Sequence, residues 1–142
     1  MDPSTYFWQV QAGKLPKPMA AKTLGMTVEQ IDQQTCTLQA TFIGKPEFTN
    51  TAGHVQGGFL SAMLDDAMRS ALAAMRAAGE FAPTVHLSIQ FIRATRPWEL
   101  HTMRHGCPAW RQHLPSVWRA VSTRQSDCHS INYCHHSEAV GQ

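Results

Sequence analysis

A segment of about twenty residues, 58–78, constrains the fold of this chain more than any other feature. Apolar residues recur there at the i, i+3, i+4 and i+7 positions of a helix, and Gly79 supplies a stop signal. They are Phe59, Leu60, Met63, Leu64, Ala67, Met68, Ala71, Leu72 and Met75. Because this pattern is rich in alanine, we expect a sheet to enclose much of the helix. Asp65 and Asp66 interrupt it, and an acid among core positions needs a reason.

Alternating apolar and polar residues on both sides of this helix predict strands. Before it, alternation covers about residues 23–28 and 36–42, and residues 32–34 are predicted to form the hairpin connection. After it, residues 83–92 show the clearest alternation in the chain. Two strands, a buried helix and a further strand predict an α+β domain whose antiparallel sheet wraps around the central helix.

Length, charge and cysteine pattern exclude several classes of protein. The 142 residues predict a single domain spanning 1–142. Twelve Lys and Arg against ten Asp and Glu are too balanced for a protein that binds nucleic acid or a membrane surface. Four unevenly spaced cysteines argue against a secreted disulfide scaffold. With no signal-peptide pattern and no apolar run long enough to cross a bilayer, we expect a cytoplasmic protein.

The first residues predict a short amphipathic helix. Tyr6, Phe7 and Val10 fall on one side of it, and Gly13 and the following prolines mark its end. We expect it to pack on the core as a lid or plug.

Residues 50–65 carry a motif that resembles the hotdog-fold thioesterases of the 4-hydroxybenzoyl-CoA and phenylacetic-acid-degradation type. The matching residues are Asn50, Gly53, Val55-Gln56-Gly57-Gly58 and Asp65, which lies eight residues after Gly57. Thr84 falls where the family often has Ser or Thr near the attacked carbonyl. The likeness covers about residues 20–97, and Gln56 departs from it, since the family usually has His there.

The resemblance implies an acyl-CoA thioesterase of the hotdog fold that needs no metal or cofactor. Thioester hydrolysis requires a polarised carbonyl and an activated water. The Gly57 N–H is the candidate oxyanion donor, because it stands at a helix start where N–H groups lack intrahelical acceptors. Asp65 is the candidate general base or nucleophile. The alternatives are that Gly57 and Gly58 only make a tight turn, and that Asp65 is a structural carboxylate in a dimer interface.

The spacing of Gly57 and Asp65 predicts a composite site. Eight residues at a rise of about 1.5 Å place them about 12 Å apart along the helix. One carbonyl cannot contact both within the same helix, so we expect Asp65 to come from a second protomer whose helix runs antiparallel. The family's dimer has the same implication, and we expect a homodimer that assembles further into a dimer of dimers. Asp66, about 100° further round the helix, is expected to be structural.

The remaining candidates have weaker roles. Asn50 could orient the water or hold the loop. Gln56 can donate and accept hydrogen bonds but cannot titrate near neutrality, and His54 lies two residues away in the loop. Gly58 is a candidate for close substrate approach. Arg93, with Arg96 after it, could meet the phosphates of coenzyme A, or both could be ordinary surface arginines.

Other functions stay open. A non-hydrolytic hotdog protein that binds acyl-CoA, or an inactive variant, is the main alternative, and Gln56 and the residues after Pro97 both permit it. A hotdog dehydratase normally pairs a His with an acid, and the absence of His at position 56 counts against it.

The tail after Pro97 lacks the alternation that the remaining strands of such a sheet require. It holds three of the four Trp, three of the four Cys and six of the eight His. One interpretation is a zinc site built from Cys128, His129, Cys134, His135 and His136, although adjacent ligands seldom converge on one tetrahedron.

The other interpretation is a shift of reading frame near Pro97. Displaced one nucleotide forward, codons for Asp, Asn, His and Tyr become Ile, Thr or Met codons, and Cys codons become Val or Ala codons. Residues 127–129 and 132–136 would then read as strand, and each of Trp98, Trp110 and Trp118 would give Gly. Sequencing the coding DNA across codon 97 tests this hypothesis, which predicts that the chain as written has lost its native sheet edge and folds poorly or is inactive.

Overall fold

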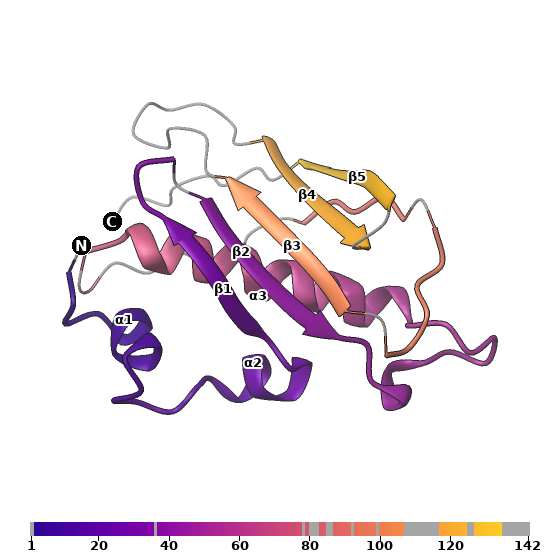
Figure 1. Cartoon of the computed structure of the whole chain (residues 1–142), viewed down its shortest axis with the longest axis horizontal. Coiled ribbons are helices and arrows are strands. Elements are labelled where there is room, and N and C mark those ends of the chain that lie inside the picture. The colour runs from indigo at the N-terminus through magenta and orange to yellow at the C-terminus, as the bar shows by residue number, and fades with distance from the viewer. Residues whose placement is uncertain are drawn as a thin grey trace.

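One antiparallel sheet curves around one long helix in the computed structural model. The structure describes residues 2–35, 37–77, 79, 83–84, 87–91, 93–98, 100–106, 117–124 and 127–134. Its helices are α1 (Tyr6–Gln11), α2 (Met19–Leu24) and α3 (Gly57–Met75), with a 3-10 turn at Pro46–Phe48. Its strands are β1 (Thr27–Asp32), β2 (Thr37–Ile43), β3 (Leu100–Gly106), β4 (Val117–Arg124) and β5 (Asp127–Cys134). They follow the order β1-β2-β3-β4-β5, and every neighbouring pair is antiparallel (Figure 1).

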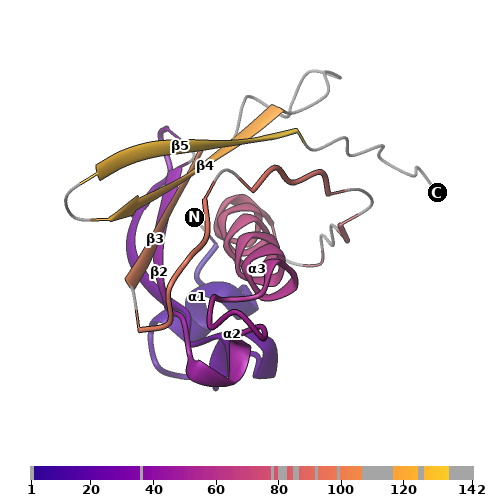
Figure 2. The same cartoon turned by 90° about the vertical axis from the view of Figure 1, so that its right-hand side faces the viewer.

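The structure confirms the long helix that the 3.6-residue periodicity predicts. α3 covers most of the predicted range 58–78, but it ends at Met75, where Arg76 turns to an extended backbone. Its face toward the sheet is lined by Ala67, Ala71 and Ala74, which are all buried. Such small side chains let the strands approach the helix closely, and the view along α3 shows the sheet wrapped around it (Figure 2).

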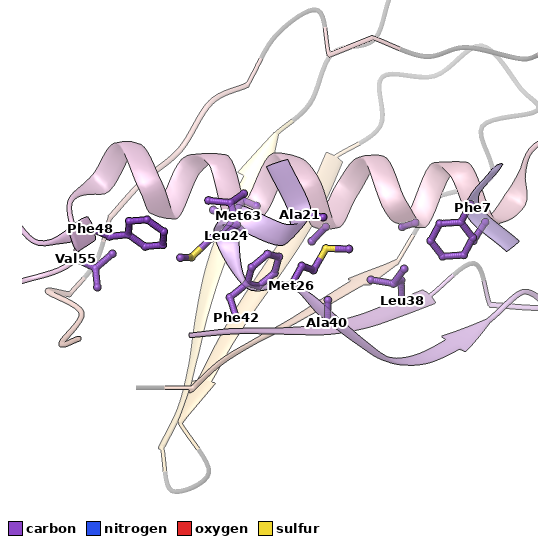
Figure 3. Close-up of a cluster of buried hydrophobic side chains, with 14 residues drawn as sticks. Phe7, Ala21, Leu24, Met26, Leu38, Ala40, Phe42, Phe48, Val55 and Met63 are labelled. Carbon is purple, nitrogen blue, oxygen red and sulfur yellow. The ribbon is translucent and has the colours of Figure 1, made fainter. Parts of the chain in front are cut away.

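The core lies between α3 and β2. Leu38, Ala40 and Phe42 alternate inward from β2 and are 0% exposed. They point from the strand toward α3, from which Met63 meets them (Figure 3). Phe48 and Val55 close the same cluster near the start of α3, and Phe7 of α1 lies near its other end (Figure 3). The N-terminal helix therefore packs on the core, as expected. Its Trp8 also donates from Nε1 to the Ala74 carbonyl at 3.2 Å.

The first hairpin confirms one prediction and corrects another. β1 and β2 pair from Thr27↔Thr41 to Asp32↔Thr37, close to the predicted connection at 32–34. The strand predicted for 23–28 is wrong over most of its length, because residues up to Leu24 belong to α2. Gly25 ends α2 in the left-handed region at φ 73°, and the Met26 N–H donates to the Ala21 carbonyl. This turn buries Leu24 and Met26 two residues apart, which imitates the alternation of a strand.

The strand predicted for residues 83–92 is not formed in the described residues 83–84 and 87–91, apart from a single bridge residue at Ser88. The alternation of burial survives nonetheless. Leu87 and Ile89 are half-buried while Ser88 and Gln90 are exposed, and Ile89 packs against the core. The alternation in residues 83–92 indicates which side of the segment is buried. A strand also requires a neighbouring backbone that forms hydrogen bonds with it.

The tail supplies three of the five strands, so the expectation that it lacks strands is wrong. β3 pairs with β2 from Thr37↔Gly106 to Ile43↔Leu100, and β4 and β5 form a hairpin from Val117↔Cys134 to Arg124↔Asp127. Of the zinc ligands considered, His135 and His136 lie outside the described residues. No helix in the described part of the chain combines the length and apolarity that crossing a membrane requires.

Candidate functional site

The loop before α3 is held by Asn50. Its side-chain Oδ1 accepts hydrogen bonds from the N–H groups of Ala52 and His54, at 3.0 and 3.1 Å. Its backbone N–H donates to the His54 carbonyl and its carbonyl accepts from Gly53, whose φ of 76° suits glycine. These hydrogen bonds join Asn50 to the other residues of the loop.

Aromatic packing and backbone hydrogen bonds fasten this loop to the helix start. Phe48 stacks on Phe59 with ring centroids 4.2 Å apart and an interplanar angle of 17°. The Gln56 N–H donates to the Phe48 carbonyl at 2.8 Å, and Thr49 and Val55 form an antiparallel bridge. These contacts determine where the first turn of α3 begins.

The first turn of α3 presents unused donors. Gln56 is the N-cap residue, and its side chain makes no capping hydrogen bond. Its carbonyl accepts from the N–H groups of Phe59 and Leu60, whereas those of Gly57 and Gly58 have no acceptor among the described residues. These two N–H groups stand at the positive end of the helix dipole. The arrangement suits a developing negative charge.

Phe91 covers one side of this helix start. A Cβ built on Gly57 would lie 3.0 Å from Cζ and 3.2 Å from Cε2 of Phe91, whereas one built on Gly58 would meet nothing within 4 Å. Phe91 itself is 50% exposed. A side chain at position 57 would therefore require the Phe91 ring to shift by a few tenths of an ångström. Sequence reasoning missed Phe91, because only the return path of the chain brings it to Gly57.

Asp65 and Thr84 form the second group of predicted residues. The Thr84 hydroxyl donates to Asp65 Oδ1 at 2.5 Å, and no hydrogen bond to Asp65 Oδ2 occurs among the described residues. Asp65 is half-buried on α3. A carboxylate held by one oxygen keeps its second oxygen for a water or a substrate.

The two groups are separated along the helix and joined by the returning chain. From Thr84 beside Asp65 the chain runs back to Phe91 beside Gly57, and the Thr95 carbonyl then accepts from the Val55 N–H at 2.8 Å. The exposed Arg93 lies between these last two contacts, and Arg96 follows them. Within one chain, the predicted residues at the start of α3 and in the loop before it lie close together; they are Asn50, His54, Gln56, Gly57 and Gly58. Asp65 and Thr84 lie about two turns away.

Asp66 differs from Asp65 in surroundings. It is only 7% exposed, and burial raises the pKa of its carboxyl, an effect opposed by Arg69 and assisted by Asp65. Its Oδ2 is buried with no hydrogen-bond partner in the described part of the chain. The sequence marks Asp66 as an acid at a core position. A purely structural carboxylate would be expected to have a hydrogen-bond partner for Oδ2.

Comparisons with known proteins place this geometry in context. No protein-family model matches the chain, and no curated protein matches it significantly. Several solved structures do. One is a Ralstonia eutropha JMP134 protein described as a candidate thioesterase related to phenylacetic acid degradation. It is 26% identical, with a TM-score of 0.79, over 92% of this chain and 98% of that one.

Two further structures are more distant in sequence. The PaaI protein of the E. coli phenylacetic acid degradation operon is 18% identical, with a TM-score of 0.71, over 93% of this chain and 94% of its own. A hypothetical thioesterase protein of Streptococcus pneumoniae TIGR4, solved with coenzyme A, is 16% identical, with a TM-score of 0.64, over 83% and 91%. The chain has the α+β hotdog fold of these thioesterase structures, as the resemblance implied.

Proposed function

We propose that this hotdog-fold chain is an acyl-CoA thioesterase that hydrolyses the thioester of an acyl- or aryl-CoA to a free acid and coenzyme A. One observation carries the proposal. The same helix, α3, has two N–H groups without acceptors at its start and, further along, the Asp65 carboxylate that the Thr84 hydroxyl holds. The description of the Ralstonia eutropha protein supports the reaction class. The coenzyme A solved with the Streptococcus pneumoniae protein supports the acyl carrier.

In the proposed mechanism, the thioester carbonyl binds at the start of α3. The Gly57 N–H, helped by the helix dipole, stabilises the oxyanion that forms when the carbonyl is attacked. Asp65 acts as general base on a water, or as the nucleophile itself, and Thr84 positions its Oδ1. Asn50 holds the loop in shape through its hydrogen bonds, and Arg93 binds the phosphates of coenzyme A. The mechanism assigns no step to a metal or cofactor.

The proposal requires a second protomer. Since Gly57 and Asp65 of one helix lie about 12 Å apart, each site takes Gly57 from one protomer and Asp65 from its partner. Segment 87–91, in which Leu87 and Ile89 are half-buried, has no strand ladder among the described residues and supports pairing with a second copy. We propose a cytoplasmic homodimer that assembles into a dimer of dimers.

Release of free thiol from a panel of aryl- and aliphatic acyl-CoA esters tests the activity. We expect hydrolysis by the wild-type chain and a loss of about a hundredfold or more in Asp65→Ala. The matched control is Glu47→Gln, an exposed acid outside both groups, which should hydrolyse like wild type. Hydrolysis unaffected by Asp65→Ala refutes the assignment. Binding of acyl-CoA without thiol release by the wild-type chain favours the non-catalytic alternative, which Gln56 permits.

Mixing two inactive variants tests the composite site. Asp65→Ala and Gly57→Val chains each lose activity alone. In a heterodimer, the intact Gly57 of the first chain meets the intact Asp65 of the second, so one of the two sites is complete. Random assembly from equal amounts should therefore recover about a quarter of wild-type activity. If the co-expressed mixture stays as inactive as its components, each site lies within one protomer or the roles are wrong.

A further inference from the structure

The two N–H donors at the start of α3 have different surroundings. The Cβ position of Gly57 lies 3.0 Å from Cζ of Phe91, whereas the Cβ position of Gly58 has no neighbour within 4 Å. The donor pair is therefore closed on one side by an aromatic ring and open on the other. A group that binds to these donors has to fit against the ring on the closed side.

Contacts before and after Phe91 in the chain hold its ring in this place. Ile89, two residues earlier, packs against the core. Four residues later, the Thr95 carbonyl accepts a hydrogen bond from the Val55 N–H at 2.8 Å. Leu87 and Ile89 are half-buried and the residues after each of them are exposed, so the alternation carries Phe91 to the side of the segment that faces α3. The ring is thus a wall of defined position.

Phe91 contributes less to the core than its size allows. Its side chain is 50% exposed, whereas those of Phe7, Phe42 and Phe48 are buried. Burying an aromatic side chain is a large source of stability, and Phe91 gives up part of that gain. The uncovered part of the ring is available for contact with a bound substrate.

A thioester presents two arms to this wall. Its carbonyl carbon carries the acyl chain on one side and the sulfur of coenzyme A on the other. When the carbonyl oxygen accepts from the Gly57 N–H, one arm runs along the closed side of the donor pair. The pantetheine arm of coenzyme A contains amide groups, which would lose hydrogen bonds to water against an apolar ring. The α-carbon of an acyl group has no such bonds to lose, so the closed side suits the acyl arm.

We propose that Phe91 determines specificity at the α-carbon of the acyl group, where its ring accepts a CH₂ and excludes a branch. This inference rests on the proposed thioesterase function and deepens it. The Cβ of an alanine at position 57 would already press on the ring. An additional methyl group beside the bound carbonyl meets the same obstacle, which acts against branched substrates and leaves unbranched ones unaffected. The substrates are then acyl-CoA esters without a branch at the α-carbon.

Two isomeric esters isolate the position of the branch. 2-Methylbutanoyl-CoA carries its methyl group on the α-carbon, and 3-methylbutanoyl-CoA carries the same group one carbon further away. One methylene in an apolar site discriminates by about 10-fold to 200-fold. We expect wild-type kcat/KM to favour the 3-methyl isomer by at least about tenfold. The ratio of kcat/KM for two substrates does not depend on the amount of folded enzyme, so a loss of stability alone cannot change it.

Thiol release from the two isomers by Phe91 variants tests the proposal. Phe91→Ala opens the closed side and should lower the ratio about tenfold. Phe91→Leu keeps an apolar side chain in place should the alanine variant fold poorly, and it should lower the ratio by a smaller factor. The matched control is Tyr6→Ala, because Tyr6 is 51% exposed and belongs to α1, whose Phe7 lies at the other end of the core cluster (Figure 3). It should keep the wild-type ratio.

The proposal is overturned if Phe91→Ala and Phe91→Leu both keep the wild-type ratio. It is also overturned if Phe91→Ala changes only the preference between an acyl-CoA and the corresponding acyl-N-acetylcysteamine thioester, because the ring would then meet the coenzyme A arm. In both cases the wild type still hydrolyses unbranched esters, and the proposed thioesterase function stands without this role for Phe91. Absence of thiol release by the wild type from any acyl-CoA overturns that function and the specificity with it.

Discussion

The hydroxyl of Thr84 donates to Oδ1 of Asp65 at 2.5 Å and so ties the chain that follows α3 back to the middle of that helix. This bond fixes one oxygen of a half-buried carboxylate. It joins two candidate functional residues that lie 19 positions apart in the sequence.

Thr84→Val removes the hydroxyl but keeps the shape of the side chain. Without the bond, the Asp65 carboxylate can rotate away from its working position, and we expect kcat for thioester hydrolysis to fall about tenfold, with a smaller change in KM. Thr84→Ser keeps the donor and should hydrolyse within about threefold of wild type. Steady-state thiol release measures both, and equal rates for the Val and Ser variants would show that the bond has no catalytic consequence.

Gly57 and Gly58 should respond oppositely to alanine. Alanine is favoured over glycine in helices by up to about 1 kcal/mol, and Gly58 has open space for a Cβ, so Gly58→Ala should stabilise the fold slightly. In Gly57→Ala the Cβ meets the Phe91 ring. This contact should cost about 1 kcal/mol, which cancels or reverses the gain in helix stability. Urea unfolding measures the difference. In a Phe91→Ala background the two substitutions should become equivalent, and a persistent difference would exclude the ring as its cause.

Asn50→Ala should destabilise the loop before α3. It removes the acceptor of the hydrogen bonds from Ala52 and His54, each of which contributes about 1 kcal/mol. We expect a loss of about 1–2 kcal/mol in the free energy of unfolding. Asn50→Asp retains the acceptor and should lose less than half of that amount. If the two variants unfold alike, Oδ1 does not hold the loop.

Asp66→Asn should change how stability depends on pH. Burial raises the pKa of Asp66 in the folded chain above its ordinary value of 3.8, so the folded state keeps a proton that the unfolded chain has released. The stability that this provides is complete below the ordinary value and is lost as pH rises through the folded pKa. The wild type should therefore lose stability relative to Asp66→Asn between acidic and neutral pH. Urea unfolding at a series of pH values measures it, and parallel curves would contradict the prediction.

Leu38→Ala should cost about 2–5 kcal/mol in the free energy of unfolding, because Leu38 is fully buried between β2 and α3. Ile43→Ala, at the exposed end of the same strand, should cost less than about 1 kcal/mol. Chemical denaturation of the two variants compares them, and equal losses would show that α3 does not pack against Leu38.

The parts of the fold that local patterns specify could be predicted from the sequence. α3 and β2 follow from periods of 3.6 and 2 within single segments, whereas β1 shares only Thr27 and Val28 with the strand predicted before it. Short α2 could not be recognised, since Leu24 before the left-handed Gly25 and Met26 after it are buried at the spacing of a strand. Residues 83–92 show the reverse limit. Their alternation gives the buried side, but a ladder depends on a backbone elsewhere in the molecule.

The candidate site divides in the same way. The structure brings Asn50 and Gly57 together at the start of α3, and Thr84 contacts Asp65. The ring of Phe91 over Gly57 could not be predicted, nor could the cavity that α1 and α3 line beside Asp66. Both arise where segments distant in sequence pack together, and no spacing within α3 records what covers its flanks.

The adjacent acids of α3 have a consequence for insertions and deletions in the gene. One residue turns the helix by about 100°, so deleting a residue between Gly58 and Asp65 would carry Asp66 into the eighth position after Gly57. A carboxylate would then still stand at the place of Asp65, while Ala67 would take the place of the buried acid. A deletion of one residue would therefore keep a carboxylate at the eighth position, remove the acid from the next one and turn the buried residues after it by the same angle.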